Sequence, residues 1–187
     1  MPPLPNRRAT RLATRVQALD DAVDAWVARR RGPTLDPLFY GLSSAADHGL
    51  LWLLLGSARA ARRGDPMIAI RLAVDLGVES FLTNGPIKLA FNRVRPEHPL
   101  GRDDPLPYGM HRPISSSFPS GHAATAFTAA MLLRDSPWAP VYFALAALVA
   151  SSRVYVKMHH ASDVLVGAAL GLTMGAVARR ILPLTRS

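Results

Sequence analysis

The sequence predicts an all-α membrane protein, a polytopic bundle of about five transmembrane helices preceded by an N-terminal amphipathic helix. Hydrophobic residues make up 49% of the 187 residues, although the formal net charge is +9. The apolar residues gather in runs of helical length, and arginines stand at the ends of these runs, as they do beside membrane spans. No strand or hairpin pattern competes. A soluble helical bundle remains the alternative fold, because charged residues interrupt several runs.

The first predicted unit covers residues 1–35 and consists of an N-terminal arm and an amphipathic helix. Within 10–31, apolar residues recur at helical spacing, with arginine and aspartate on the other face. This helix is too charged to span a bilayer. We expect it either to lie on the membrane surface with Trp26 at the interface, or to dock on the bundle as an ordinary helix. Gly32 and Pro33 end it.

The second predicted unit, 36–187, is the transmembrane domain. Its five candidate spans are 36–58, 67–91, 120–133, 138–156 and 161–182. The last span has Gly167, Gly171 and Gly175 at every fourth position, which would let another helix approach closely. The other interpretation of these glycines is that they only tolerate lipid.

Four charged residues, Lys88 among them, interrupt the second candidate span. Arg71, Asp75 and Glu79 are four residues apart, so they fall on one stripe of a helix and predict a structural ion network. Gly85 and Pro86 predict a kink near the end of the same span. The proline-rich segment that follows, at 92–119, is either a functional loop or disordered. Its two histidines, His98 and His111, have no partners at ligand spacing and are expected to be loop residues.

A polar segment between the last two runs carries the strongest chemical pattern. His159 and Asp163 are four residues apart, so on a helix the carboxylate can hold one imidazole nitrogen and leave the other free to attack. Arg153 could bind phosphate oxygens in a forked geometry. His160 has no acid four residues further on and is not expected to take part. The alternative is an interfacial cluster in which Arg153 and Lys157 extend toward water.

Alternating spans bring four polar helix ends to one membrane face: the end of the second span, the start of the third, the end of the fourth and the start of the fifth. The residues gathered there are Lys88, Arg95, Ser120, Gly121, His122, Arg153, His159 and Asp163. Three cations without cysteine or a carboxylate cluster predict an anionic substrate, most naturally a phosphate, bound without a metal or cofactor. A helix that opens at Gly121 would add backbone N–H donors for that anion.

The two histidines at this face are expected to have different catalytic roles. We expect His159, oriented by Asp163, to attack phosphorus, and His122 to give a proton to the leaving oxygen. The cations would neutralise the charge that develops in the transition state. A nucleic-acid partner is not expected, because only two of the 22 basic residues are lysine and they do not alternate with stacking aromatic residues.

Three sequence blocks carry a resemblance to a known family. The first is Lys-x6-Arg-Pro at 88–96, the second is Pro-Ser-Gly-His at 119–122, and the third is Ser-Arg-x5-His-x3-Asp at 152–163. Together they resemble the type 2 phosphatidic acid phosphatase (PAP2) superfamily, which shares this pattern with bacterial acid phosphatases and vanadium haloperoxidases. The resemblance covers 67–182. It differs in span number, since membrane members typically have six and this sequence predicts five.

The resemblance implies a helical bundle of the PAP2 type and a metal-independent lipid phosphatase. It implies that His159 forms a phosphohistidine, that Asp163 is its partner and that His122 is the acid. The positions that resemble the family's phosphate binders are Lys88, Arg95, Ser120, Gly121 and Arg153.

The expected substrate is a phosphorylated lipid in the bacterial cytoplasmic (inner) membrane. The short length and the alanine- and arginine-rich style resemble short actinobacterial members of the family that are proposed to act on decaprenylphosphoryl-5-phosphoribose in cell-wall precursor synthesis. Polyprenyl diphosphate, phosphatidylglycerol phosphate and phosphatidate stay open as substrates, as does a membrane scaffold or transporter without enzymatic activity. The flanking arginines are equally numerous on both sides of the predicted bundle, so they do not indicate on which face of the membrane the site lies.

Overall fold

The computed structural model describes residues 7–98, 106–107, 110 and 115–184, and the side chains among them from Arg11 onward. The described residues form helices and connecting segments and contain no strand, which confirms the all-α prediction. The helices are α1 Arg7–Ala28, α2 Asp36–Ala45, α3 Leu50–Arg63, α4 Met67–Leu82, α5 Gly121–Leu132, α6 Ala139–Tyr155 and α7 Ala161–Ile181. The division into units 1–35 and 36–187 remains a prediction.

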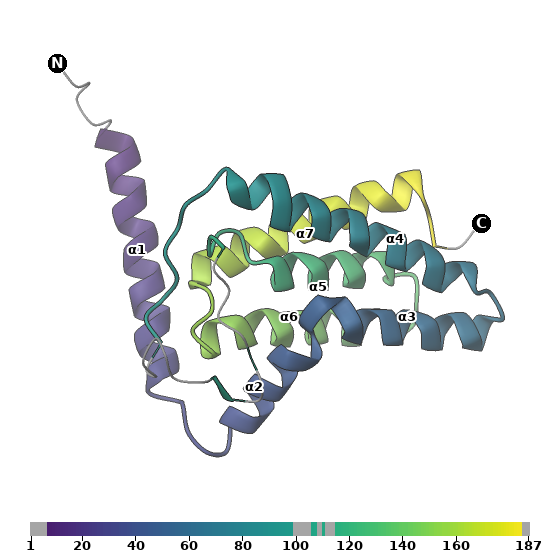
Figure 1. The fold of residues 1–187 in the computed structure, drawn as a ribbon, viewed down its shortest axis with the longest axis horizontal. Coiled ribbons are helices and arrows are strands. Elements are labelled where there is room, and N and C mark those ends of the chain that lie inside the picture. The colour runs from purple at the N-terminus through teal and green to yellow at the C-terminus, as the bar shows by residue number, and fades with distance from the viewer. Residues whose placement is uncertain (1–6, 99–105, 108–109, 111–114, 185–187) are drawn as a thin grey trace.

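Helix α5 is the centre of the bundle. It packs mainly against α7 and α6, and also against α4. Figure 1 shows α3 to α7 running side by side, while α1 projects from one end of the bundle. The glycines of α7 permit the tight α5–α7 packing, because a Cβ added at Gly171 would lie 2.2 Å from the Ala124 carbonyl oxygen. Close helix approach, rather than tolerance of lipid, therefore explains the glycine pattern.

Two breaks interrupt the predicted spans. The candidate span 36–58 is bent, because α2 and α3 meet at an angle of 59° across a 3-10 turn, Asp47–Gly49. His48 has a φ of 55° and Gly49 a φ of 73°, and these left-handed conformations turn the chain. The predicted kink after α4 is confirmed as a π-helical turn, Thr83–Ile87, that contains Pro86.

The expected Arg71–Asp75–Glu79 network is not formed. Arg71 instead donates to the Pro183 carbonyl oxygen at 2.8 Å, and Glu79 accepts a hydrogen bond from Thr125 at 2.6 Å. The spacing did place the three side chains on one helix stripe. Carbonyl groups beyond the end of α7, which lack helical partners, bind Arg71 in preference to its neighbours.

Fewer helices than expected are both long and apolar enough to cross a membrane. By length and composition, α7 alone can cross a membrane among the described helices, and the bent α2–α3 pair would be a second span if it crosses as one unit. The shorter helices α4, α5 and α6 have 16, 12 and 17 residues, so they reach only about 18–26 Å against a hydrocarbon core of about 30 Å. The five-span prediction is therefore unconfirmed.

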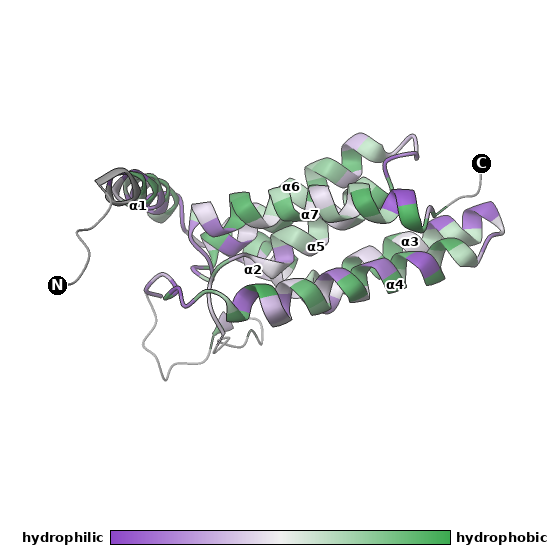
Figure 2. Ribbon diagram, turned by 90° about the horizontal axis from the view of Figure 1, so that it is seen from above, coloured by the Kyte–Doolittle hydropathy of each residue, from purple (hydrophilic) through white to green (hydrophobic). Residues whose placement is uncertain are grey.

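Apolar side chains nevertheless face outward along the bundle. On α4, Ile70, Val74 and Val78 are each at least half exposed, and Leu165 on α7 is exposed as well. Figure 2 shows hydrophobic residues along much of α5, α6 and α7, with hydrophilic residues at the ends of the bundle. Large exposed apolar faces of this kind fit a lipid environment better than water.

Candidate active site

A cavity of about 560 Å³ lies where the bend before α3, the end of α4 and the start of α5 meet. Six of the eight predicted site residues line it: Lys88, Arg95, Gly121, His122, Arg153 and His159. The other two, Ser120 and Asp163, are completely buried, and the Ser120 N–H donates to the Asp163 carbonyl oxygen at 3.0 Å. The structure therefore brings all eight predicted residues together.

His159 lies between α6 and α7 with one ring nitrogen held by the backbone. Its Nδ1 donates to the Ser117 carbonyl oxygen at 2.6 Å. The expected carboxylate partner is more distant, since Asp163 Oδ2 lies 3.7 Å from the same nitrogen. Asp163 instead accepts the His160 N–H at 2.9 Å and thereby caps the start of α7. Ser117 is thus a site residue that the side-chain spacing did not reveal.

The carbonyl partner determines the chemistry of the imidazole. A carbonyl only accepts, so Nδ1 carries the hydrogen and Nε2 keeps its lone pair. That Nε2 lies 3.4 Å from Arg95 Nη1, and the ring lines the cavity. Burial, assisted by the nearby charges of Arg153 and Arg95, lowers the pKa of His159 to about 3. The imidazole is therefore neutral at physiological pH and can act as a nucleophile.

Three buried donors without partners belong to Arg95 and Arg153, which line the cavity, and to Ser120, the neighbour of the lining residue Gly121. The atoms concerned are Arg95 Nε, Arg153 Nε and Ser120 Oγ, each lacking a hydrogen-bond partner within the part of the chain that the structure describes. Burial lowers the pKa of Arg95, while the charge of Asp163 acts in the opposite direction. Buried guanidinium and hydroxyl donors require acceptors. A phosphate group supplies several acceptor oxygens and negative charge, so it fits this donor set.

Asp47 is a cavity residue that the motif analysis missed. The bend between α2 and α3 places its Oδ1 2.7 Å from His122 Nε2, and both side chains line the cavity. The one available signal was that Asp47 and His48 interrupt an otherwise apolar run. Among the described residues, no group of three His, Cys, Asp or Glu side chains is placed to hold a metal ion.

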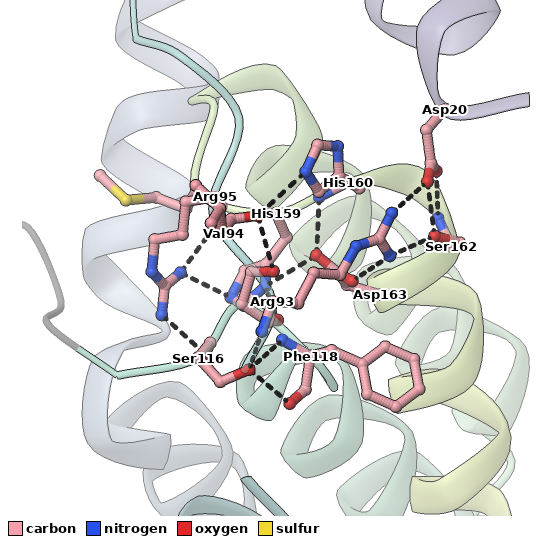
Figure 3. Close-up of polar contacts among 12 residues, drawn as sticks. Asp20, Arg93, Val94, Arg95, Ser116, Phe118, His159, His160, Ser162 and Asp163 are labelled. Carbon is pink, nitrogen blue, oxygen red and sulfur yellow. Dashed lines mark hydrogen bonds and ion pairs between the residues drawn. The ribbon is translucent and has the colours of Figure 1, made fainter. Parts of the chain in front are cut away.

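Arg93 is the second missed residue, and Figure 3 shows it between two carboxylates. It donates to Asp163 Oδ1 at 2.6 Å and to Asp20 Oδ2 at 2.6 Å. Arg93 lies at a variable position within the first motif, and Asp20 belongs to α1, so no local spacing links the two. The guanidinium joins the N-terminal helix to the Asp163 carboxylate.

Of the other histidines, His48 lines the cavity beside Asp47, whereas His160 and His98 lie away from it. His160 Nε2 is 3.2 Å from the Val94 carbonyl oxygen, and the residue is the N-cap of α7. His98 Nε2 lies 3.2 Å from the Tyr40 hydroxyl oxygen. Neither residue lines the cavity, and His111 lies outside the described residues. The expectation that His160 and His98 stand apart from the site agrees with their positions.

Comparisons with known proteins place this geometry in a family. Residues 68–186 match the sequence profile of the PAP2 superfamily. A decaprenylphosphoryl-5-phosphoribose phosphatase of Mycobacterium tuberculosis (strain ATCC 25618 / H37Rv) is 33% identical over 144 residues, which are 73% of this chain and 75% of that protein.

Two solved structures share the fold. The crystal structure of Aquifex aeolicus LpxE matches with a TM-score of 0.66 and 28% identity, covering 85% of this chain and 93% of that one. The transmembrane PAP2 type phosphatidylglycerolphosphate phosphatase from Bacillus subtilis matches with a TM-score of 0.69 and 24% identity, covering 89% and 85%.

Proposed function

Because this chain belongs to the PAP2 superfamily and its relatives are membrane lipid phosphatases, we propose that it hydrolyses decaprenylphosphoryl-5-phosphoribose through a phosphohistidine formed on His159. The observation that carries the mechanism is the lone pair on Nε2 of His159, which has only a long contact with Arg95 at 3.4 Å and lies at a cavity bordered by buried arginine donors without partners. A neutral nucleophile and donors for the phosphate oxygens are two requirements of the reaction.

In the proposed first step, His159 Nε2 attacks phosphorus and forms an N–P bond. The bond from phosphorus to the ester oxygen breaks, and His122 gives its proton to that leaving oxygen. The binders of the equatorial phosphate oxygens are Lys88, Arg95, Ser120, Arg153 and the backbone N–H of Gly121. Their charges and dipoles are in place before the reaction and stabilise the transition state without reorganisation.

In the second step, water attacks the phosphohistidine while His122 accepts a proton from it. The N–P bond breaks, His159 returns to its neutral form and orthophosphate leaves. Side chains and one backbone N–H of the protein supply the charge stabilisation in this scheme, so it needs no metal ion. We therefore expect activity in the presence of a chelator.

The substrate assignment rests on the Mycobacterium tuberculosis relative, whose similarity extends over most of both chains. The cavity supports a lipid substrate, because Leu53 of α3 and Leu76 of α4 form an apolar wall beside the cations. This wall could accept the first part of a prenyl chain next to the phosphate. We place the protein in the bacterial inner membrane.

The test is phosphate release by the full chain in detergent with EDTA present. The panel contains decaprenylphosphoryl-5-phosphoribose, polyprenyl diphosphate, phosphatidylglycerol phosphate, phosphatidate and a water-soluble phosphomonoester. Preferential turnover of the first compound, lost in His159→Gln, is the expected result. Preference for another lipid would overturn the substrate assignment. If no compound in the panel released phosphate, the enzymatic proposal would be overturned and a scaffold or transporter would be favoured.

A further inference from the structure

Asp20 is a buried carboxylate on the N-terminal helix. It lies outside the segment that matches the family profile, yet it is only 2% exposed. Its Oδ1 accepts the Ser162 N–H at 2.8 Å, and its Oδ2 accepts the Ser162 hydroxyl at 2.7 Å. Helix α1 thus supplies an acceptor to the first turn of α7, next to Asp163.

Arg93 extends this contact to the reaction centre. The guanidinium is shared between the buried carboxylates of Asp20 and Asp163, each at 2.6 Å. The backbone of the same residue holds a second part of the site, because the Arg93 carbonyl oxygen accepts the Ser117 N–H at 3.0 Å. Ser117 in turn accepts the Nδ1 hydrogen of His159. One residue therefore fixes both groups that border the His159 ring.

Helix α1 makes further contacts with the same part of the chain. Asp24 forms an ion pair with Lys157, two residues before His159. On another face of α1, Leu12, Leu19 and Trp26 are spaced seven residues apart and are 65%, 46% and 50% exposed. The helix therefore binds the active-site loop with its carboxylates and leaves an apolar stripe free for a membrane surface.

We propose that Asp20 and Arg93 are positioning residues through which α1 fixes Asp163, the Ser117 carbonyl and thereby the His159 ring. This inference rests on the proposed role of His159. The energetic reason is that a guanidinium shared by two buried carboxylates holds all three groups in one geometry. Removal of Arg93 leaves two buried carboxylates without their cation. Removal of the Asp20 charge leaves Arg93 paired with Asp163 alone, so the guanidinium is no longer held by α1.

The kinetic test compares Asp20→Asn with Asp21→Asn. Asp21 is the adjacent residue, is exposed, and has a described hydrogen bond only to Gln17. Asp21→Asn therefore makes the same chemical change without touching Arg93 or Ser162. With decaprenylphosphoryl-5-phosphoribose in detergent micelles, Asp20→Asn should lower kcat about 10- to 100-fold at unchanged KM, as expected for a misplaced nucleophile. Asp21→Asn should match the wild type. Arg93→Gln should resemble Asp20→Asn, and the double variant should be no worse than either single variant.

A second readout does not depend on turnover. The His159 Nδ1 proton, in a short bond to a carbonyl, should give a downfield NMR signal that broadens or disappears in Asp20→Asn and persists in Asp21→Asn. Arg93→Lys, which keeps the charge but cannot fork between the carboxylates, serves if Asp20→Asn fails to fold. Wild-type kcat together with an unchanged signal in folded Asp20→Asn or Arg93→Lys would overturn the positioning role. A wild-type protein that releases no phosphate would overturn the proposed function. The NMR signal alone would then show whether Asp20 and Arg93 fix the His159 ring.

Discussion

Asp47 Oδ1 lies 2.7 Å from His122 Nε2, in a contact between the bend before α3 and the first turn of α5. An ionised carboxylate only accepts hydrogen bonds, so Nε2 of His122 carries a proton. Both side chains line the cavity. To give a proton to a leaving oxygen, the His122 ring must carry a proton on both nitrogens, and the Asp47 carboxylate favours this imidazolium form.

Substitution of Asp47 by Asn tests this arrangement. The amide keeps the shape but removes the charge that favours the proton-bearing nitrogen. We expect kcat for an alkyl phosphate to fall about 10- to 100-fold, within the usual contribution of general acid catalysis. An aryl phosphate with a good leaving group should lose much less, since its oxygen needs no proton. Equal losses on both substrates would contradict the acid role.

The pH dependence follows from His159. Its pKa in the folded protein, about 3, is below its ordinary value of 6.5. Between these values the unfolded chain binds more protons, so this residue should make stability fall as the pH decreases from about 6.5 toward 3. In thermal unfolding, His159→Gln should lose less stability than the wild type over that range. In kinetics, kcat/KM of the wild type should show no acid limb from His159 above about pH 4. Equal losses of stability in the wild type and His159→Gln over that range would contradict the assignment.

Arg153 tests the phosphate-binding geometry. Its side chain is 4% exposed, its Nη1 donates to the Ser43 hydroxyl, and its Nε has no partner among the described residues. Arg153→Lys keeps the charge but loses the planar fork. We expect kcat/KM to fall about 100-fold, equivalent to about 3 kcal/mol of transition-state stabilisation. Arg62→Lys, at an exposed position near the end of α3, is the control; equal kinetics in the two variants would exclude a forked contact.

The α5–α7 contact predicts a difference between two glycines. A Cβ at Gly171 would lie 2.2 Å from the Ala124 backbone oxygen, whereas one at Gly77 meets nothing within 4 Å. Gly171→Ala should lower the free energy of unfolding by about 1–3 kcal/mol, the usual cost of overpacking. Gly77→Ala should be neutral or stabilising. Thermal unfolding in detergent distinguishes them, and equal Tm values would show that α5 and α7 can separate at no cost.

The motif residues could be predicted from sequence because their spacing is local. The pairs Lys88 and Arg95, and His159 and Asp163, are each close in the sequence, so a spacing pattern can identify them before the packing of the helices is known. Ser117, in contrast, acts through a backbone carbonyl, which no side-chain pattern reveals. Asp20 and Arg93 are 73 residues apart, and only the docking of α1 makes them neighbours.

The fold shows a similar division. Apolar periodicity located the helices, and the glycines of α7 indicated a close contact. Apolar periodicity did not indicate the bend at Asp47. The bend depends on a left-handed conformation at His48, which tertiary packing sets and which a histidine signals less clearly in the sequence than a glycine does. The number of membrane spans stays a prediction, because apolar character alone does not determine where a helix such as α5 ends.

The most direct measurement is rapid trapping of the phosphoenzyme. Wild-type protein is mixed with decaprenylphosphoryl-5-phosphoribose that carries 32P in its terminal phosphate, quenched in alkali within one turnover, and mapped by mass spectrometry. We predict an acid-labile, alkali-stable phosphate on His159 that forms as fast as the substrate is consumed and is absent from His159→Gln. Turnover by the wild type without label on His159, or turnover by His159→Gln, would contradict the account.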